Sequence, residues 1–152
     1  METTELEFRG KRIDNGEWIY GYLTVHFSAS SGYDEKSPHI EFFKSDHFET
    51  WEVDPKTVGQ YTGVRDSADS RIYVGNIVRW EEEPEAIFVV KFGKYCTEQT
   101  EEEVAENWHC GFYLSPIEPD QENWGLTGSE FEDYHFEIIG NVFENQELLK
   151  TE

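Results

Sequence analysis

The chain has 152 residues and carries 33 Asp and Glu against 12 Lys and Arg, which gives a net charge of −21. That length suits one domain or two small lobes, and the acidity disfavours general binding to DNA or RNA, which needs clustered basic residues to neutralise phosphates. An aromatic content of 16% indicates a folded domain, because disordered acidic chains are poor in aromatic residues.

Membrane-spanning and secreted proteins have features that this sequence lacks. No apolar run approaches the roughly 18–20 residues that a membrane-spanning helix needs. The first residues, Met1 to Glu5, lack the basic region and apolar stretch of a secretory signal. Two cysteines are too few for a disulfide framework. We therefore expect a cytoplasmic protein with no membrane partner.

The first pair of strands is predicted at residues 8–13 and 18–25. The stretch from Trp18 to Val25 is rich in aromatic and β-branched residues, as strands are. Asn15-Gly16 lies between the two stretches, and this dipeptide favours a tight turn with positive φ. The pattern predicts an antiparallel hairpin. After it we expect a flexible loop over residues 28–37.

The middle of the chain contains a short strand candidate and a turn-rich segment. Residues 40–43 are predicted to form a strand, whereas Pro55 disfavours a central strand over residues 53–61. Residues 65–70 are rich in short polar side chains that bond to their own backbone. If the chain forms two lobes, this segment separates lobes 1–66 and 67–152; otherwise residues 1–152 form one domain.

Three further strands are predicted at residues 75–80, 86–92 and 137–143, where apolar and β-branched residues dominate. Helix signals are sparse. Residues 100–108 combine Thr100 with Glu103 in a capping-box pattern, although an exposed acidic loop explains the same residues, and residues 145–149 suggest one terminal turn. We therefore predict a mainly β fold with little helix, either a small SH3-like β-barrel or two packed β lobes.

The acidic residues are concentrated in the second half of the chain. Residues 1–76 carry 8 basic and 14 acidic side chains, whereas residues 77–152 carry 4 and 19. The excess lies in four clusters, at residues 81–85, 98–106, 118–122 and 130–133, with apolar runs between them. This alternation indicates a β core whose loops carry the negative charge. The charge promotes solubility, and a specific binding role is the alternative.

Three stretches together carry a family resemblance. They are residues 8–22, with Phe-Arg-Gly-Lys-Arg and Asn-Gly-Glu-Trp-Ile-Tyr-Gly-Tyr; residues 57–63 with 72–78; and residues 138–145, Ile-Ile-Gly-Asn-Val-Phe-Glu-Asn, with Leu148. In this order they resemble the YopX family of bacteriophage and prophage proteins. The resemblance implies a small, β-rich, phage- or prophage-encoded cytoplasmic protein, and it supplies no catalytic residues. In that family a glycine is usual near Asp69. Asn15, Asp66 and Asn141 are interpreted as residues that cap turns and backbone groups.

Metal binding and catalysis both lack a convincing pattern. Cys96, His109, Cys110 and His135 are the residues that zinc would use, but no Cys-x-x-Cys pair is present. The sequence contains no Gly-x-Ser-x-Gly elbow, phosphate loop or dinucleotide fingerprint. Close carboxylates are expected by chance among 33 acids. We expect no metal, no cofactor and no catalytic residues.

Two tryptophans and three glutamates are the candidate binding residues. Trp108 and Trp124 lie in acidic, loop-like surroundings, where an exposed indole often marks an interface. The candidate surface is completed by the glutamates that precede Trp108, namely Glu101, Glu102 and Glu103. The leading hypothesis is a non-enzymatic accessory protein that binds an unknown protein of the host or the phage.

Three alternatives stay open. The acidic surface could imitate a nucleic acid and inhibit a host DNA-binding protein. The domain could instead be an enzyme or a β-barrel that binds a small ligand. Direct binding to nucleic acid would rest on Arg9, Lys11 and Arg12 alone, which the net charge disfavours. A homo-oligomer formed through exposed strand edges is compatible with the sequence.

Overall fold

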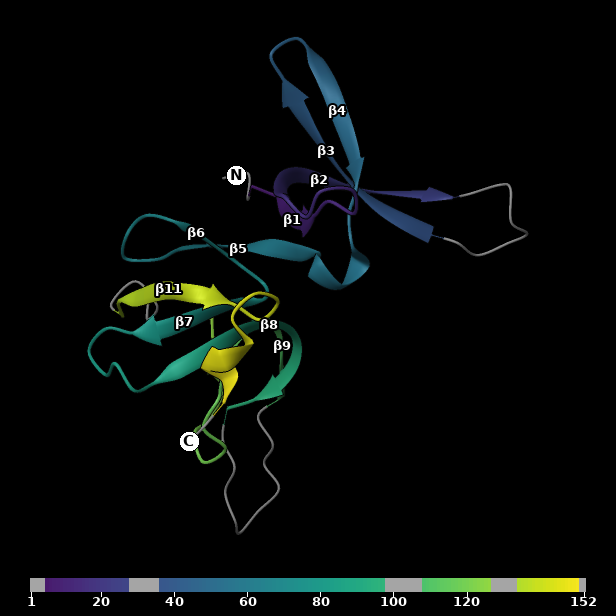
Figure 1. The fold of residues 1–152 in the computed structure, drawn as a ribbon. Coiled ribbons are helices and arrows are strands. Elements are labelled where there is room, and N and C mark those ends of the chain that lie inside the picture. Colours follow the sequence, from purple (N-terminus) through teal and green to yellow (C-terminus); the bar gives the residue numbers. More distant parts are fainter. Residues whose placement is uncertain (1–4, 28–35, 98–107, 127–133, 151–152) are drawn as a thin grey trace. The chain divides into compact units, whose positions relative to one another are not determined.

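The computed structural model describes residues 5–27, 36–97, 108–126 and 134–150 (Figure 1). Its elements are β1 (Phe8–Lys11), β2 (Trp18–Phe27), β3 (Lys36–Lys44), β4 (His47–Glu52), η1 (Pro55–Thr57), β5 (Gly59–Arg65), β6 (Arg71–Tyr73), β7 (Asn76–Trp80), β8 (Ile87–Cys96), β9 (Trp108–Pro116), β10 (Trp124–Gly125), β11 (Phe136–Asn141) and η3 (Gln146–Leu149). The predicted mainly β fold is confirmed. Both sheets are antiparallel and open, so among the described residues neither closes into a barrel.

The chain divides into two compact units, Met1–Tyr61 and Thr62–Glu152. The strands of the first unit are hydrogen-bonded in the order β4-β3-β2-β1-β5, and β5 continues into the second unit, where β6 follows it. The second unit contains a five-stranded sheet in the order β10-β9-β8-β7-β11. No helix among the described residues is long and apolar enough to cross a membrane.

The predicted first hairpin is present. Strands β1 and β2 pair in antiparallel register from Phe8 opposite Gly21 to Lys11 opposite Trp18. The turn differs in detail from the expected one, because Gly16 has a φ of +73° while Asn15 has no positive φ. Instead, Asn15 accepts a hydrogen bond from the Glu17 amide through its side chain, which caps the turn.

Strand β2 pairs next with β3, and β3 pairs with β4, a strand that the sequence did not reveal. The β3–β4 hairpin projects from the rest of its unit (Figure 1). Ile40 and Val53 are fully buried in this unit. Gly10 permits Val53 to approach, since a Cβ at Gly10 would lie 2.9 Å from the Val53 Cβ.

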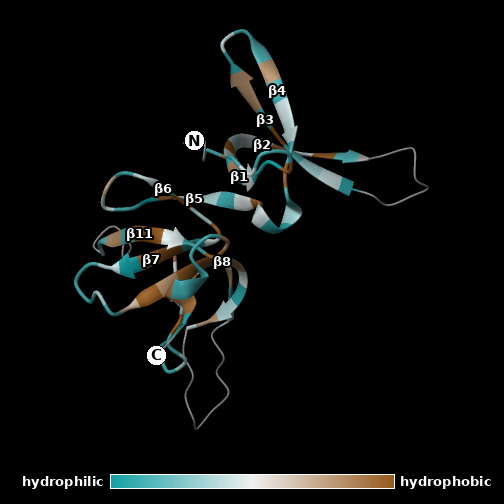
Figure 2. Cartoon of the chain, viewed as in Figure 1, coloured by the Kyte–Doolittle hydropathy of each residue, from teal (hydrophilic) through white to brown (hydrophobic). Residues whose placement is uncertain are grey.

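The three strands that the sequence predicted in the second unit, β7, β8 and β11, contribute half of its buried core residues, and the others come from β6, from β9 and from the residues beside β8 and β10. Strand β7 pairs with β8 on one side and with β11 on the other. The buried side chains of this core are Ile72, Val78, Ala86, Phe88, Val90, Leu114, Leu126 and Phe136. Figure 2 shows the hydrophobic colour concentrated along β7 and β8. The predicted terminal turn is also present, as η3.

Two polar residues hold the loops of this unit, as the sequence indicated. Asp66 accepts hydrogen bonds from the amides of Ala68 and Ser70 with one oxygen, and from the Ile138 amide with the other. Asn141 accepts hydrogen bonds from the amides of two residues that follow it, at positions 143 and 144. Both side chains therefore have a structural role.

Candidate functional site

Four exposed aromatic side chains lie on one face of the first unit's sheet. They are Tyr20, Tyr22, Phe43 and Phe48, here called the aromatic sheet face, and their exposed fractions are 46%, 61%, 61% and 61%. Side chains two residues apart on a strand share a face, which places Tyr20 and Tyr22 together. The register sets Tyr22 opposite Glu41, two residues from Phe43, and sets Phe43 opposite Phe48. The rings of Phe43 and Phe48 meet edge to face, with their centroids 5.1 Å apart.

The same face carries polar groups farther along the strands. His26 and His39 stack with their ring centroids 3.9 Å apart. The Thr50 hydroxyl donates a hydrogen bond to Glu41, which lies directly opposite it. The face therefore offers exposed rings together with hydrogen-bond donors and acceptors, which is the composition of a protein-binding surface.

Arg9 and Arg12, the two arginines of the predicted basic patch, both make contacts within the first unit. The Arg12 guanidinium lies 3.5 Å from the ring centroid of Trp51 and bonds to both carboxylate oxygens of Asp14. The hydrogen bond with Asp14 raises the pKa of Arg12, and the same bond lowers the pKa of Asp14. Arg9 is buried, with its guanidinium 4.5 Å from the ring centroid of Trp18. These contacts leave little of the basic patch for phosphate groups.

The second unit contains a cluster of three rings at its surface, Trp80, Trp124 and Tyr134, here called the Trp80 cluster. The ring centroids are 5.3 Å apart for Trp80 and Trp124, 5.7 Å for Trp80 and Tyr134, and 5.5 Å for Trp124 and Tyr134. Both tryptophans are half-buried against the core, and Tyr134 is 41% exposed. Every pair meets edge to face, so the rings form a packed layer that continues the core to the surface.

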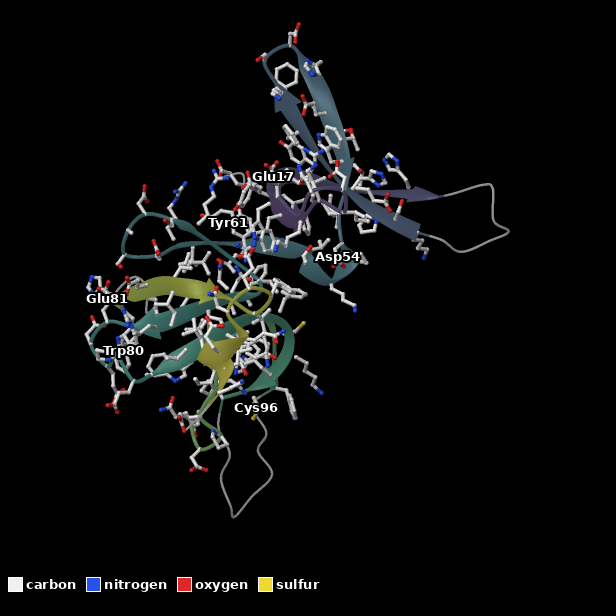
Figure 3. All side chains as sticks on the ribbon, viewed as in Figure 1. Glu17, Asp54, Tyr61, Trp80, Glu81 and Cys96 are labelled. Carbon is white, nitrogen blue, oxygen red and sulfur yellow. The ribbon has the colours of Figure 1, made fainter. Side chains whose placement is uncertain are left out.

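Four exposed glutamates follow Trp80 in the β7–β8 turn, as Figure 3 shows for Glu81. Glu81 accepts a hydrogen bond from the Ser67 hydroxyl, and Glu82 lies 2.8 Å from His135 Nδ1. The hydrogen bond with His135 lowers the pKa of Glu82, and the bond with Glu82 raises the pKa of His135. Glu83 and Glu85 make no side-chain hydrogen bond or ion pair with any described residue.

The structure does not bring the two predicted tryptophans together. Trp108 begins β9 and pairs with Cys96, whereas Trp124 pairs with Leu114, six residues farther along the same strand. At about 3.3 Å per residue this places them roughly 20 Å apart. Trp108 is exposed and lies near Lys94, whose Nζ is 4.3 Å from the ring centroid, while Trp124 belongs to the Trp80 cluster.

The predicted glutamates Glu101, Glu102 and Glu103 lie outside the described residues, and their role stays a prediction. The suggested helix at residues 100–108 lies outside them too, apart from Trp108, which is in a strand.

The cysteines and histidines do not converge on a metal site among the described residues. Strand register pairs Lys94 with Cys110 and Cys96 with Trp108, so both cysteines share one face of the β8–β9 hairpin. His109 pairs with Tyr95 and lies on the opposite face, because neighbouring side chains alternate.

The aromatic sheet face was missed from the sequence, although part of its signal is visible there. Tyr20 and Tyr22 have the two-residue spacing of one strand face, and Phe43 and Phe48 flank the turn at residues 45–46. Recognising the face requires β4 and its register with β3, which depend on pairing rather than on local composition.

The chain is similar to known proteins over nearly its whole length. The family model described as YopX protein matches residues 7–150. Protein EF1440 from Enterococcus faecalis, whose crystal structure is known, is similar over 95% of this chain and 98% of its own, with a TM-score of 0.39 and 16% sequence identity. No curated protein shows significant similarity to the chain.

Proposed function

The chain belongs to the YopX protein family, and from this premise we propose that it is a phage- or prophage-encoded accessory protein of the bacterial cytoplasm that acts by binding another protein. The proposal has no catalytic step. The observation that carries it is the aromatic sheet face, where four large rings are 46–61% exposed. Contiguous exposed apolar groups on a folded domain usually mark an interaction surface.

The energetics of this face favour a partner. Each ring leaves roughly 100 Å² in water, and burial of apolar area contributes about 25 cal/mol per Å², so each ring offers about 2–3 kcal/mol on docking. Part of this gain offsets the entropy lost on association. Aromatic residues in the centre of an interface are also its commonest hot spots. Four such rings are therefore enough to anchor a protein of complementary shape.

The experiment compares partner recovery by the wild type and by a variant of this face. A tagged chain is expressed in infected host cells, and bound proteins are recovered at low and at moderate salt. We expect Tyr22→Ser/Phe43→Ser to lose a partner that the wild type retains, since both rings are removed from the face. Phe92→Ser is the matched control, because Phe92 is 58% exposed but lies on β8 in the second unit.

Recovery of the same partner by Tyr22→Ser/Phe43→Ser and by the wild type would contradict the proposed surface. If the wild type recovers no reproducible partner at either salt concentration, the proposed function itself fails. Recovery of untagged copies of the chain would identify the partner as a second copy. Circular dichroism of each variant checks that its strands are retained.

Nucleic-acid mimicry is the second candidate, supported by the concentration of charge in the second unit. Residues 62–152 carry 21 acidic and 6 basic side chains. A mimic would occupy the basic groove of a host DNA-binding protein, and its complex would weaken steeply with salt, because exposed charges are screened within about 8–10 Å at physiological ionic strength. A complex whose affinity is unchanged between low and moderate salt excludes this mode of binding.

A further inference from the structure

We propose that the Trp80 cluster and the glutamates of the β7–β8 turn together form a docking surface for an arginine-bearing segment of a partner protein. This surface lies in the second unit and does not depend on the aromatic sheet face. The surface combines aromatic rings with negative charges, and the chain contains a matching arrangement with its arginine elsewhere.

The rings provide surfaces on which a cation can stack. Tyr134 is 41% exposed, and both tryptophans are half-buried, so each of the three residues keeps part of its surface in solvent. A guanidinium over the face of a tryptophan or tyrosine gains about 0.5–2 kcal/mol. Because the rings are held by one another and by the core beneath them, their placement costs little entropy when a partner docks.

The negative charges beside the rings favour a docked group that is positively charged. Glu83 and Glu85 are exposed carboxylates without a described partner, whereas Glu81 accepts a hydrogen bond from Ser67 and Glu82 is hydrogen-bonded to His135. Two arginines of this unit are engaged elsewhere, since Arg79 forms an ion pair with Glu137 and Arg65 forms one with Asp69. An anionic ligand would be repelled, whereas a cationic one would be attracted by every charge in the turn.

Arginine fits this surface better than lysine. Its planar guanidinium stacks on aromatic faces and bonds to a carboxylate through two parallel N–H groups. The first unit contains this arrangement in full, since Arg12 lies on the Trp51 ring and bonds to both oxygens of Asp14. The Trp80 cluster has the tryptophans and the carboxylates, and no described cation lies on its rings. A partner's arginine would complete it.

The test measures binding of a fluorescein-labelled peptide containing four arginines spaced by Gly-Ser to the full chain, by fluorescence anisotropy in about 150 mM salt. The same peptide with lysine in place of arginine is the comparison probe. The site variants are Glu83→Gln/Glu85→Gln, which keeps side-chain size, and Tyr134→Leu, which removes a π face. Asp46→Asn/Glu52→Gln removes two exposed charges from the first unit and is the matched control.

We expect the wild type and the control to bind the arginine peptide equally, and each site variant to bind it about fivefold to tenfold more weakly, as for the loss of roughly 1–1.4 kcal/mol. The lysine peptide should bind at least about threefold more weakly than the arginine peptide.

Equal weakening in the control and the site variants would show nonspecific attraction to the net charge and would overturn the proposal. So would equal affinity for the two peptides, or no binding by the folded wild type at millimolar concentration. None of these results bears on partner recovery through the aromatic sheet face.

Discussion

Gly21 is the residue at which the backbone of the first unit leaves least room. It lies in β2 where that strand ends its pairing with β1 and begins its pairing with β3. A Cβ at this position would overlap the backbone carbonyl oxygen of Glu41 and would lie 3.1 Å from the Cβ of Phe42. A backbone obstacle cannot rotate away as a side chain can, so the position requires glycine.

Replacement of this glycine is predicted to destabilise the first unit. Gly21→Ala should lower the free energy of unfolding by about 3 kcal/mol, at the upper end of the cost of overpacking. Gly63→Ala is the comparison, because a Cβ there meets nothing within 4 Å and only its φ of +85° opposes a side chain. That change should cost about 1 kcal/mol. Urea denaturation followed by circular dichroism measures both, and an equal loss in the two variants would contradict the steric explanation.

Asp69 illustrates a residue preference that the sequence did indicate. Its φ of +64° is in the left-handed region, where glycine is usual and Asp or Asn is tolerated. The family resemblance placed a glycine near this position. Here Asp69 adopts this conformation, and its carbonyl oxygen accepts a hydrogen bond from Arg65.

At the scale of elements, the sequence predicted the strands whose own residues define them. Strands β2, β7, β8 and β11 are rich in β-branched and aromatic residues, and each was expected close to its observed bounds. Strands β4 and β9 were among those missed, because their sequences, His-Phe-Glu-Thr-Trp-Glu and Trp-His-Cys-Gly-Phe-Tyr-Leu-Ser-Pro, mix polar, charged and aromatic residues. Each is paired with the strand that precedes it, and that pairing cannot be inferred from the composition of the segment alone.

The same limit applied to the candidate binding residues. Trp108 is exposed, as an interface residue must be, but the sequence could not show that it lies far along β9 from Trp124. It also could not show that Trp124 packs with Trp80 and Tyr134, since that contact joins three separate segments. Surface composition was therefore readable from the sequence, whereas the grouping of residues into surfaces required strand register.

One ion pair joins two elements of the second unit and responds to pH. Glu82 lies in the β7–β8 turn and His135 lies just before β11. The hydrogen bond between them raises the pKa of His135 above its ordinary value and lowers the pKa of Glu82 below its ordinary value. Folding favours the protonated histidine. The histidine therefore contributes to the free energy of unfolding below about pH 6.5, and this contribution is lost as the pH rises through its raised pKa. The glutamate's contribution is lost as the pH falls below about 4.5.

We predict that the pair stabilises the folded chain most between about pH 4.5 and 6.5. An NMR titration of the His135 ring should show a midpoint above the usual value of about 6.5, and Glu82→Gln should bring that midpoint down toward it. The melting temperatures of the wild type and Glu82→Gln should differ most between about pH 4.5 and 6.5 and should converge as the pH rises through the raised pKa of His135. An unchanged His135 midpoint in Glu82→Gln would show that the contact does not form in solution.

At the scale of the whole molecule, the net charge of −21 acts against folding. Folding brings these like charges closer together on a compact surface, so they repel one another more strongly than in the extended, unfolded chain. Among the described residues, the ion pairs that offset this repulsion include Arg12 with Asp14 and Arg79 with Glu137, and pairs that reach solvent contribute at most about 1 kcal/mol each. We therefore expect self-repulsion to be the dominant electrostatic effect on stability.

Added salt should consequently stabilise the chain. Raising NaCl from 0.01 M to 0.1 M shortens the screening length from about 30 Å to about 10 Å, which weakens long-range repulsion much more than contacts at 3–4 Å. We expect the melting temperature to rise by roughly 3–6 °C, equivalent to about 1–2 kcal/mol for a chain of this length, measured by calorimetry at pH 7. Choline chloride should act as NaCl does, because the effect is one of screening rather than of cation binding. A melting temperature that falls with either salt would mean that the attractive ion pairs outweigh the repulsion among the acidic residues.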